Sequence, residues 1–272
     1  RRLGIRNVLW GIRNSHFESG GTRLKRAIRK VCAWGSHRLP TTVVCVADSA
    51  MAVHARAGYD RSRMQVIHNG YDPANFTFSS THRKQLRDEL GMTEDNLVVG
   101  SVGRYSPAKD HASFIRAAAI VGQRIEHVRF LLVGRGLTRD NPELAELISA
   151  TGMPERFLLL GERSDVAACM SAMDVFCLHS RTEGFPNVLG EAMCVGLPCV
   201  STDVGDARLL LGDTGMTVNG ATPDDLARVL RDMLRLPPAQ RMALGAQARQ
   251  RIVERYTLDH AVRKFEALYQ ST

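Results

Sequence analysis

The sequence lacks any stretch that would cross a membrane and any cysteine pattern that would bind zinc. Its apolar runs stay short of the roughly 18 residues that a membrane-spanning helix needs. Six cysteines are present, with no C-x-x-C pair and no histidine spacing suited to zinc: Cys32, Cys45, Cys169, Cys177, Cys194 and Cys199. Most lie in apolar runs, so we expect buried free thiols in a reducing compartment rather than disulfides or metal ligands.

The motifs of several enzyme classes are also missing. There is no H-E-x-x-H zinc-protease motif, no G-x-S-x-G esterase motif and no Walker loop. No D-x-D pair follows an apolar run, so the sequence offers no carboxylate cage for a divalent cation. It also has no lysine motif suited to a pyridoxal cofactor, which argues against a phosphorylase. We therefore expect chemistry that needs neither a metal nor a cofactor.

The sequence begins at Arg1 without a methionine, and its basic start lacks the apolar core and cleavage site of a signal peptide. At 272 residues it is long for one domain and suits one full domain plus part of another. We expect a fragment that lacks an N-terminal portion of its protein and that works in the cytoplasm.

Positive charge is concentrated near the start of the chain. Residues 1–63 hold 13 Lys and Arg against three acidic residues, whereas the remainder is nearly neutral. Nucleic acid is one partner that such a surface could attract. However, Trp10, Phe17 and Trp34 are the only aromatic residues among the first 58, which is few for base stacking. We therefore expect no nucleic-acid partner.

A basic amphipathic helix is expected over residues 22–36. Thr22 suits the N-cap, and apolar residues follow at steps of three and four with lysines and arginines between them. The apolar residues are Leu24, Ala27, Ile28, Val31 and Trp34. Such a helix either lies on an anionic membrane surface or packs in the ordinary way with a solvated basic face. The sequence leaves both possibilities open.

Strand and helix patterns alternate along the chain. They predict strands at 5–12, 41–47 and 64–67, with helices at 48–57 and 81–90. A longer series follows at 96–102, 109–124, 128–133, 141–150, 157–160, 164–171, 173–178, 187–195 and 198–201, and the last helices are expected at 223–235, 238–254 and 258–270. The alternation predicts an α/β fold whose parallel sheet has helices on both faces.

The most informative stretch runs from Arg181 to Asp206. A loop ends at Pro186, and a helix is expected to begin at Asn187. Pro186 suits a helix entry because it lacks an N–H group that would otherwise have no partner. The first turn of such a helix offers free N–H groups and the positive end of the peptide dipoles. This arrangement can hold an anion such as a phosphate.

Two glutamates flank this helix start. Glu191 lies one turn after Asn187 on the same face, where its carboxylate could accept hydrogen bonds from the ribose attached to a bound phosphate. Glu183 lies before the helix, where a sugar at the other end of a diphosphate would lie. The alternative is an ordinary loop carboxylate and a solvated helix residue. Asp203 and Asp206, which close the region, are expected to be loop and capping residues.

Further candidates follow predicted strands. Gly103 permits close approach of a ligand to the backbone, and Arg104 and Lys109 can supply a fork and a point charge for a diphosphate. Arg13 and His16 follow the first strand, at the strand end where α/β folds place ligand groups. The alternative for Arg104 and Lys109 is a pair of surface cations, and a lone loop histidine is often neither a ligand nor a catalyst.

The string E-G-F-P-N-V-L-G-E, with the V-G-R turn at 102–104 and Lys109 after it, resembles the retaining nucleotide-sugar glycosyltransferases of the GT-B type, family four. Bacterial enzymes of lipopolysaccharide, capsule and exopolysaccharide synthesis are the most similar. The resemblance implies two Rossmann-like domains joined by a linker at 68–73. Residues 1–74 would be the remainder of the acceptor-side domain, 75–257 the nucleotide-sugar-binding domain, and 258–272 a helix crossing back.

The resemblance also implies roles for the candidate residues. The expected donor-binding residues are Gly103, Arg104, Lys109, Arg163, Glu183, Gly184, Phe185, Pro186, Asn187, Val188 and Glu191. Among these, Glu191 would bind the ribose, backbone N–H groups of residues 184–188 would line the sugar and phosphates, and Arg163 would lie near the base. Glu183, Arg104 and Lys109 would be the catalytic residues, and Arg13 and His16 would lie on the acceptor side.

The implied reaction transfers a sugar from a nucleotide-sugar, commonly a UDP-sugar, with retention of anomeric configuration. The acceptor would be a glycan or a lipid-linked sugar at the inner face of the cell membrane, which would explain a basic helix at 22–36. The sequence lacks the glycine-rich segment with which the family's acceptor-side domain opens. We therefore expect this chain to bind the donor, but we do not expect it to catalyse transfer by itself. The alternative is a non-catalytic nucleotide-sugar-binding protein with the same fold.

Overall fold

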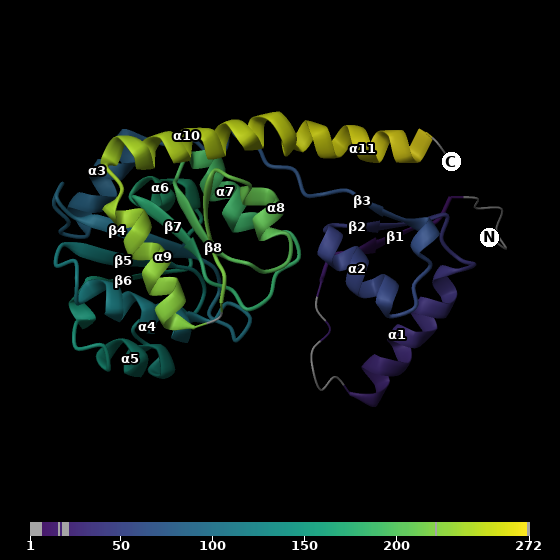
Figure 1. Cartoon of the computed structure of the whole chain (residues 1–272), viewed down its shortest axis with the longest axis horizontal. Helices are drawn as coiled ribbons and strands as arrows, with labels where there is room; N and C mark the ends of the chain where they lie inside the picture. Colours follow the sequence, from purple (N-terminus) through teal and green to yellow (C-terminus); the bar gives the residue numbers. More distant parts are fainter. Residues whose placement is uncertain (1–6, 16, 18–21, 221, 271–272) are drawn as a thin grey trace.

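The computed structural model describes residues 7–15, 17, 22–220 and 222–270. They form two lobes of unequal size, each built around a parallel sheet, with a long helical segment running above both (Figure 1). The expected α/β class with parallel sheets is therefore confirmed.

The first lobe contains a three-stranded sheet in the order β1-β2-β3. The strands are β1 (Leu9–Ile12), β2 (Thr42–Cys45) and β3 (Met64–Val66), and the helices are α1 (Arg23–Ser36) and α2 (Asp48–Arg56). A short 3-10 turn, η1 (Arg61–Arg63), precedes β3. The central strand β2 is the most deeply buried, in keeping with its run of β-branched residues.

The second lobe contains a six-stranded sheet in the order β6-β5-β4-β7-β8-β9. Its strands are β4 (Leu97–Val102), β5 (Val128–Val133), β6 (Phe157–Gly161), β7 (Val175–Leu178), β8 (Cys199–Thr202) and β9 (Gly215–Val218). Its helices are α3 (Ser80–Glu89), α4 (His111–Gly122), α5 (Pro142–Ser149), α6 (Val166–Ser171), α7 (Asn187–Val195), α8 (Ala207–Leu211), α9 (Pro223–Arg235) and α10 (Pro238–Arg255), with a turn η2 (Pro154–Arg156) before β6.

Two hydrophobic cores cover the two faces of this sheet. One joins β4 and β5 to helices α4, α5 and α9, and the other includes residues of α6, α7, α8 and α10. The central strands are apolar along their whole length because both faces are covered. A Cβ on Gly100 of β4 would overlap the Met173 side chain, so a larger residue there would have to displace that buried side chain.

The sequence patterns missed two elements of the second lobe. No structure was expected between residues 202 and 222, yet α8 and the edge strand β9 lie there. Helix α8 has five residues and β9 has four, three of which are only partly buried. Strand β9 contains a glycine and a threonine rather than a continuous apolar run, and the five residues of α8 are too few to show a helical period.

The linker and the C-terminal helices cross beside each other between the lobes. The Tyr71 N–H donates to the Tyr256 carbonyl (2.8 Å), and the Leu258 N–H donates to the Tyr71 carbonyl (2.7 Å). A Cβ on Gly70 would lie 2.5 Å from the Leu258 Cα, so this crossing requires glycine. Beyond it, α11 (Leu258–Gln270) runs over the first lobe, where Leu268 packs with Val44 and Ile67 (Figure 1).

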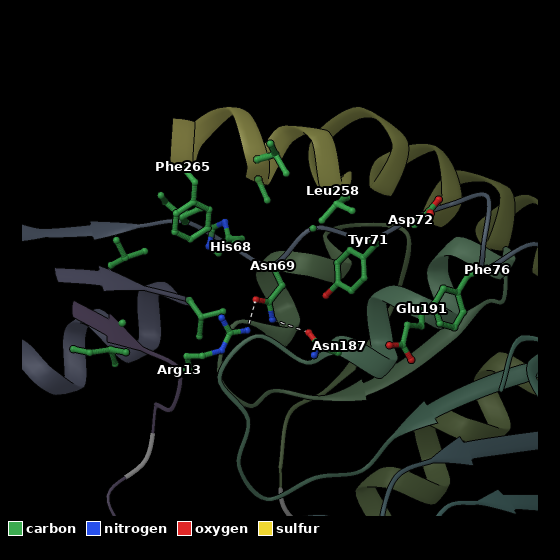
Figure 2. A pocket seen from close by; sticks show the side chains of 18 residues that line it. Arg13, His68, Asn69, Tyr71, Asp72, Phe76, Asn187, Glu191, Leu258 and Phe265 are labelled. Carbon is green, nitrogen blue, oxygen red and sulfur yellow. Dashed lines mark hydrogen bonds between the residues drawn. The ribbon is translucent and has the colours of Figure 1, made fainter. Parts of the chain in front are cut away.

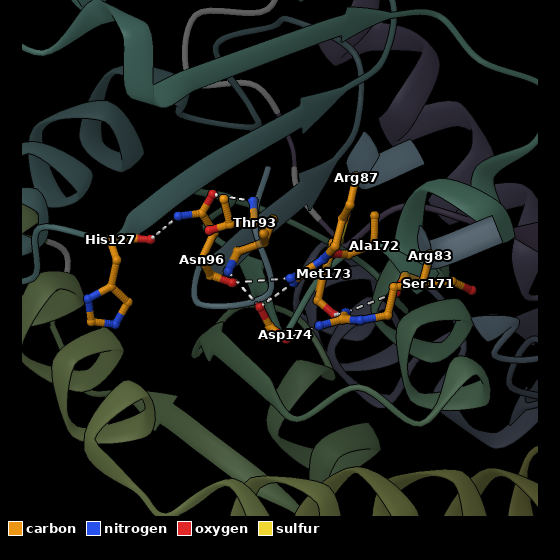
Figure 3. A network of polar contacts seen from close by, with 10 residues as sticks. Arg83, Arg87, Thr93, Asn96, His127, Ser171, Ala172, Met173 and Asp174 are labelled. Atoms are coloured by element: carbon orange, nitrogen blue, oxygen red, sulfur yellow. Dashed lines mark hydrogen bonds and ion pairs between the residues drawn. The ribbon is translucent and has the colours of Figure 1, made fainter. Parts of the chain in front are cut away.

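Helix α3 is fixed to the rest of the second lobe by ion pairs that are mostly shielded from solvent (Figure 3). The Asp174 carboxylate binds the guanidinium groups of Arg83 and Arg87, each at 2.6 Å, and accepts the Val98 N–H at 2.7 Å. Arg87 is 3% exposed and also donates to the carbonyls of Ala172 and Asn96. The linker therefore enters the second lobe through an anchored helix.

Helix α1 presents its apolar stripe to solvent. Thr22 caps it as expected, accepting the Lys25 N–H. The exposed fractions are 68% for Leu24, 53% for Ile28, 65% for Val31 and 64% for Trp34, and no acidic residue lies in the helix. Within the described residues, this stripe is therefore largely uncovered.

None of the helices formed by the described residues is long and apolar enough to cross a membrane. The cysteines within this part of the chain are all free thiols, and all but Cys32 are buried. Both observations agree with what the composition led us to expect.

Candidate functional site

Lys109 and Glu183 form an ion pair at the carboxyl ends of two adjacent strands. Lys109 follows β4 and Glu183 follows β7, and the two strands pair in the sheet. Lys109 Nζ lies 2.6 Å from Glu183 Oε1, and the Ser180 hydroxyl donates to the same oxygen at 2.6 Å. Both charged side chains are mostly buried. The strand-end position is where open α/β sheets bind ligands.

A buried histidine lies beneath this pair. His179 Nδ1 donates to the Lys109 carbonyl at 2.6 Å, and its Nε2 is 2.7 Å from the Ser101 hydroxyl. Burial lowers the pKa of His179 to about 3 and that of the neighbouring His111 to about 4. Both rings are therefore neutral at physiological pH, and His179 fixes the main chain that carries Lys109.

Asp110, the residue after Lys109, has an unusual backbone conformation. It has a φ of 53°, the left-handed region that favours glycine, and it is the only non-glycine residue described with a positive φ. Its carboxylate caps α4 and binds Arg181 through two oxygens, at 2.8 and 2.9 Å. Burial would raise the pKa of Asp110, but these hydrogen bonds lower it overall. Asp is among the residues that tolerate this conformation.

Glu191 lines a hollow between the lobes, beside the linker (Figure 2). The hollow has a volume of about 560 Å³ and is also lined by Asn187, Tyr71 and Arg13. Burial raises the pKa of Glu191, and the charge of Lys109 partly opposes the rise. Pro186, at the N-cap of α7, has no side-chain group that could cap the helix. An uncapped helix start and a half-buried carboxylate therefore lie one turn apart.

Arg104 lies in a different hollow from Glu191. A cavity of about 360 Å³ is lined by Gly103, Arg104 and Arg163, together with Gly134, which directly follows β5. Arg163 is paired there with Asp165 at 2.7 Å. Lys109 lies between the two cavities. Its side chain would be 3.4 Å from a Cβ on Gly103, and its positive charge lowers the pKa of Glu191. Of these two cavities, neither is lined by both Arg104 and Glu191.

The loop from Glu183 to Phe185 lies against the first lobe. The Ser15 hydroxyl donates to the Glu183 carbonyl, and Gly184 lies close to the Arg13 carbonyl. The Phe185 side chain is 5% exposed and stacks on the His68 ring, with centroids 4.6 Å apart. The Phe185 ring therefore joins the loop to the linker.

The acceptor-side candidates are described in part. Arg13 Nη2 donates to Asn69 Oδ1 at 2.9 Å, and Asn69 Nδ2 donates to Asn187 Oδ1 at 2.7 Å (Figure 2). This chain of hydrogen bonds joins the first lobe, the linker and the start of α7. His16 lies outside the described residues.

Two site residues were missed by the sequence reasoning. His179 and Ser180 hold Lys109 and Glu183, respectively, yet neither was a candidate. Both residues directly follow the apolar run that forms β7. Arg13 was chosen as a candidate because it follows a predicted strand, and the same reasoning would have selected these two. Within the described residues, one group could hold a metal ion, namely Asp48, His68 and Asp206, whose ligand atoms lie within 4.8 Å of one another. It lies at the contact between the lobes.

Comparisons with known proteins agree with this geometry. The family of glycosyl transferases group 1 matches residues 96–235, over half of the chain. The chain is 32% identical over 212 residues to the Vi polysaccharide biosynthesis protein VipC/TviE of Salmonella typhi, covering 76% of this chain and 36% of that protein. It is 26% identical over 215 residues to the UDP-Gal:alpha-D-GlcNAc-diphosphoundecaprenol alpha-1,3-galactosyltransferase of Escherichia coli, covering 78% and 55%.

The chain therefore spans about a third to just over half of the length of these two relatives. Among solved structures, HepE of Anabaena in complex with UDP matches with a TM-score of 0.88 and 23% identity, covering 98% of this chain and 73% of that one. A likeness at this identity shows the fold, which is the GT-B fold of two Rossmann-like lobes. With the family match over residues 96–235, it follows that this chain belongs to the group 1 glycosyltransferases.

Proposed function

We propose that this chain contributes the nucleotide-sugar site, and part of the acceptor side, of a retaining glycosyltransferase. The donor is a UDP-sugar, and the acceptor is a glycan or a lipid-linked sugar in the synthesis of a cell-surface polysaccharide. The observation that carries the proposal is the 2.6 Å pair of Lys109 and Glu183, at the strand ends and next to Glu191. A UDP-bound neighbour and a relative named for a UDP-galactose donor support the choice of nucleotide.

The side chains suggest a division of labour. Lys109 and the N–H groups at the start of α7 would hold the diphosphate, and Arg104 would contribute from the adjoining hollow. Glu191 would bind the ribose hydroxyls and Glu183 the donor sugar. Negative charge develops on the leaving diphosphate, and preorganised cations and amides can stabilise it. We therefore propose transfer without a metal ion, with retention of configuration.

The surface of α1 supports a peripheral contact with the inner face of the cell membrane. Leu24, Ile28 and Val31 are exposed, and lysines and arginines surround them. Apolar residues with flanking cations suit the boundary of an anionic bilayer. A membrane-bound acceptor would then be within reach, as the diphosphoundecaprenol in the name of the E. coli relative suggests for that protein.

Calorimetric titration with UDP, GDP and ADP, each with Mg²⁺ and with a chelator, tests the donor site. We expect UDP to bind most tightly and the chelator to change little. Absence of binding by all three nucleotides would contradict the proposal, and binding that requires Mg²⁺ would overturn its metal-free form. An assay with a UDP-sugar and a lipid-linked acceptor tests transfer, and the anomeric configuration of the product tests retention. Binding without transfer would favour the non-catalytic alternative.

A further inference from the structure

Helix α2 of the first lobe is capped by a carboxylate from the second lobe. Asp206 Oδ2 accepts the Asp48 N–H at 2.6 Å, and Oδ1 accepts the Ser49 N–H at 2.9 Å. The helix has no cap of its own, because Ala47 at its N-cap position offers no side-chain acceptor. The Asp206 side chain is 4% exposed. A residue expected to be a local cap thus caps a helix 158 positions earlier in the chain.

The linker completes this contact. His68 Nε2 lies 3.2 Å from Asp48 Oδ2 and 3.5 Å from Asp206 Oδ2, and its ring stacks on Phe185. Burial would raise the pKa of Asp206, but hydrogen bonds from His68, Ser49 and Asp48 lower it below its ordinary value. The carboxylate is therefore charged at neutral pH, which suits the positive end of a helix.

The same residue also supports the glutamate loop. The Asp206 N–H donates to the Gly184 carbonyl at 2.9 Å. Gly205 has a φ of 55°, and a Cβ there would lie 2.4 Å from the carbonyl oxygens of both Glu183 and Gly184. The segment from Gly205 to Asp206 is thus packed directly on the backbone that carries Glu183. Any movement of Asp206 relative to α2 would be transmitted to that loop.

We propose that Asp206 is a positioning residue that couples closure of the two lobes to the placement of the Glu183 loop. Its carboxylate holds α2 when the lobes are together, and its main chain holds the loop that faces the donor. When the lobes separate, water replaces the carboxylate at α2 and the loop loses its support from the first lobe. This role rests on the proposed donor site, because that site is what the loop would serve.

Small-angle scattering on the whole chain tests the coupling, with Asp206→Ala as the main variant. Without nucleotide we expect a larger radius of gyration than for the wild type, and UDP affinity weakened by about three- to thirtyfold, the range expected for a lost helix cap. The matched control is Asp203→Ala on the same loop, whose ion pair is with Arg208 of its own lobe. It should leave both quantities unchanged.

A second variant acts from the other lobe. Ser49→Pro removes one N–H that Asp206 accepts, at a position in the first helical turn where proline is tolerated. We expect it to open the lobes as Asp206→Ala does, and the double variant to add little to either single change. If both variants match Asp203→Ala in radius and affinity, the proposal is overturned. The radius of gyration without nucleotide tests the Asp206 contact even if UDP does not bind. Failure of this proposal can therefore be told apart from failure of the proposed donor site.

Discussion

At the scale of single residues, the site depends on where two strands end. Lys109 and Glu183 were selected from the sequence as separate contacts to one donor, but the structure joins them directly at 2.6 Å. The sequence could not show this, because β4 and β7 are neighbours only in the folded sheet. Nor could it show that Asp110 lies in the left-handed region.

Replacing Lys109 with alanine should weaken UDP binding by about ten- to hundredfold, because a charge-assisted hydrogen bond contributes about 1.5–3 kcal/mol. Calorimetric titration measures the change. Lys84→Ala is the control, since Lys84 is an exposed lysine of the same lobe paired with Asp88. Equal affinities for the two variants would show that Lys109 does not contact the diphosphate.

His111 should make the fold sensitive to acid. Burial lowers its pKa from 6.5 to about 4, and neither ring nitrogen has a partner among the described residues. Below pH 6.5 this histidine is protonated in the unfolded chain but stays neutral in the folded chain. The free energy of unfolding therefore falls as the pH falls towards 4. This one histidine accounts for up to about 3 kcal/mol of that loss.

His111→Phe should therefore flatten the fall in the free energy of unfolding between pH 6.5 and 4. Urea unfolding at several pH values measures it, with the same substitution at the exposed His127 as the control. His179, buried beside His111, would still contribute its own acid sensitivity. If the free energy of unfolding of His111→Phe fell with pH as steeply as that of the wild type, His111 would bind its proton equally well in the folded and unfolded chains.

At the scale of secondary structure, most elements could be predicted, including the short strands β3 and β8, but two could not. The run that forms β5 matched its expected bounds, as did α7, because several consecutive residues carry the pattern. The edge strand β9 and helix α8 were missed, since their few residues are partly exposed or flanked by turns. The sequence also could not show the burial of Arg87 or the pairing of Arg83 and Arg87 with Asp174, because charged residues in a helix ordinarily face solvent.

Asp174→Ala should destabilise the second lobe by about 3–5 kcal/mol, because it leaves two guanidinium groups largely without their partner, one of them buried. Urea unfolding gives the change in free energy. Asp88→Ala is the comparison on α3 itself, where the exposed pair with Lys84 is worth about 0–1 kcal/mol. Similar losses in the two variants would refute the anchoring role of Asp174.

Helix α1 should bring the chain to anionic vesicles. Co-sedimentation with phosphatidylglycerol vesicles should be lost in Ile28→Glu, which places a charge in the exposed apolar stripe, and should be weak with neutral vesicles. Met242→Glu is the control, because Met242 is an exposed apolar residue on α10, outside α1. Sedimentation that is equal for both variants would exclude α1 as the contact.

At the scale of the whole molecule, the sequence indicated an α/β chain of the GT-B type but not how the lobes meet. The contact is made by residues distant in the chain, such as Ser15 with Glu183 and Asp206 with Ser49. Local patterns carry no information about such pairs. Nor did the sequence show that Arg104 lines one cavity and the Glu191 carboxylate another.

The most direct test of the donor site is a crystal structure of this chain with UDP. We expect the ribose hydroxyls within hydrogen-bond distance of the Glu191 carboxylate and the diphosphate against Lys109 and the first turn of α7. Arg104 should reach the nucleotide from the adjoining hollow. Density for UDP in a position where neither Lys109 nor Glu191 touches it would contradict the account.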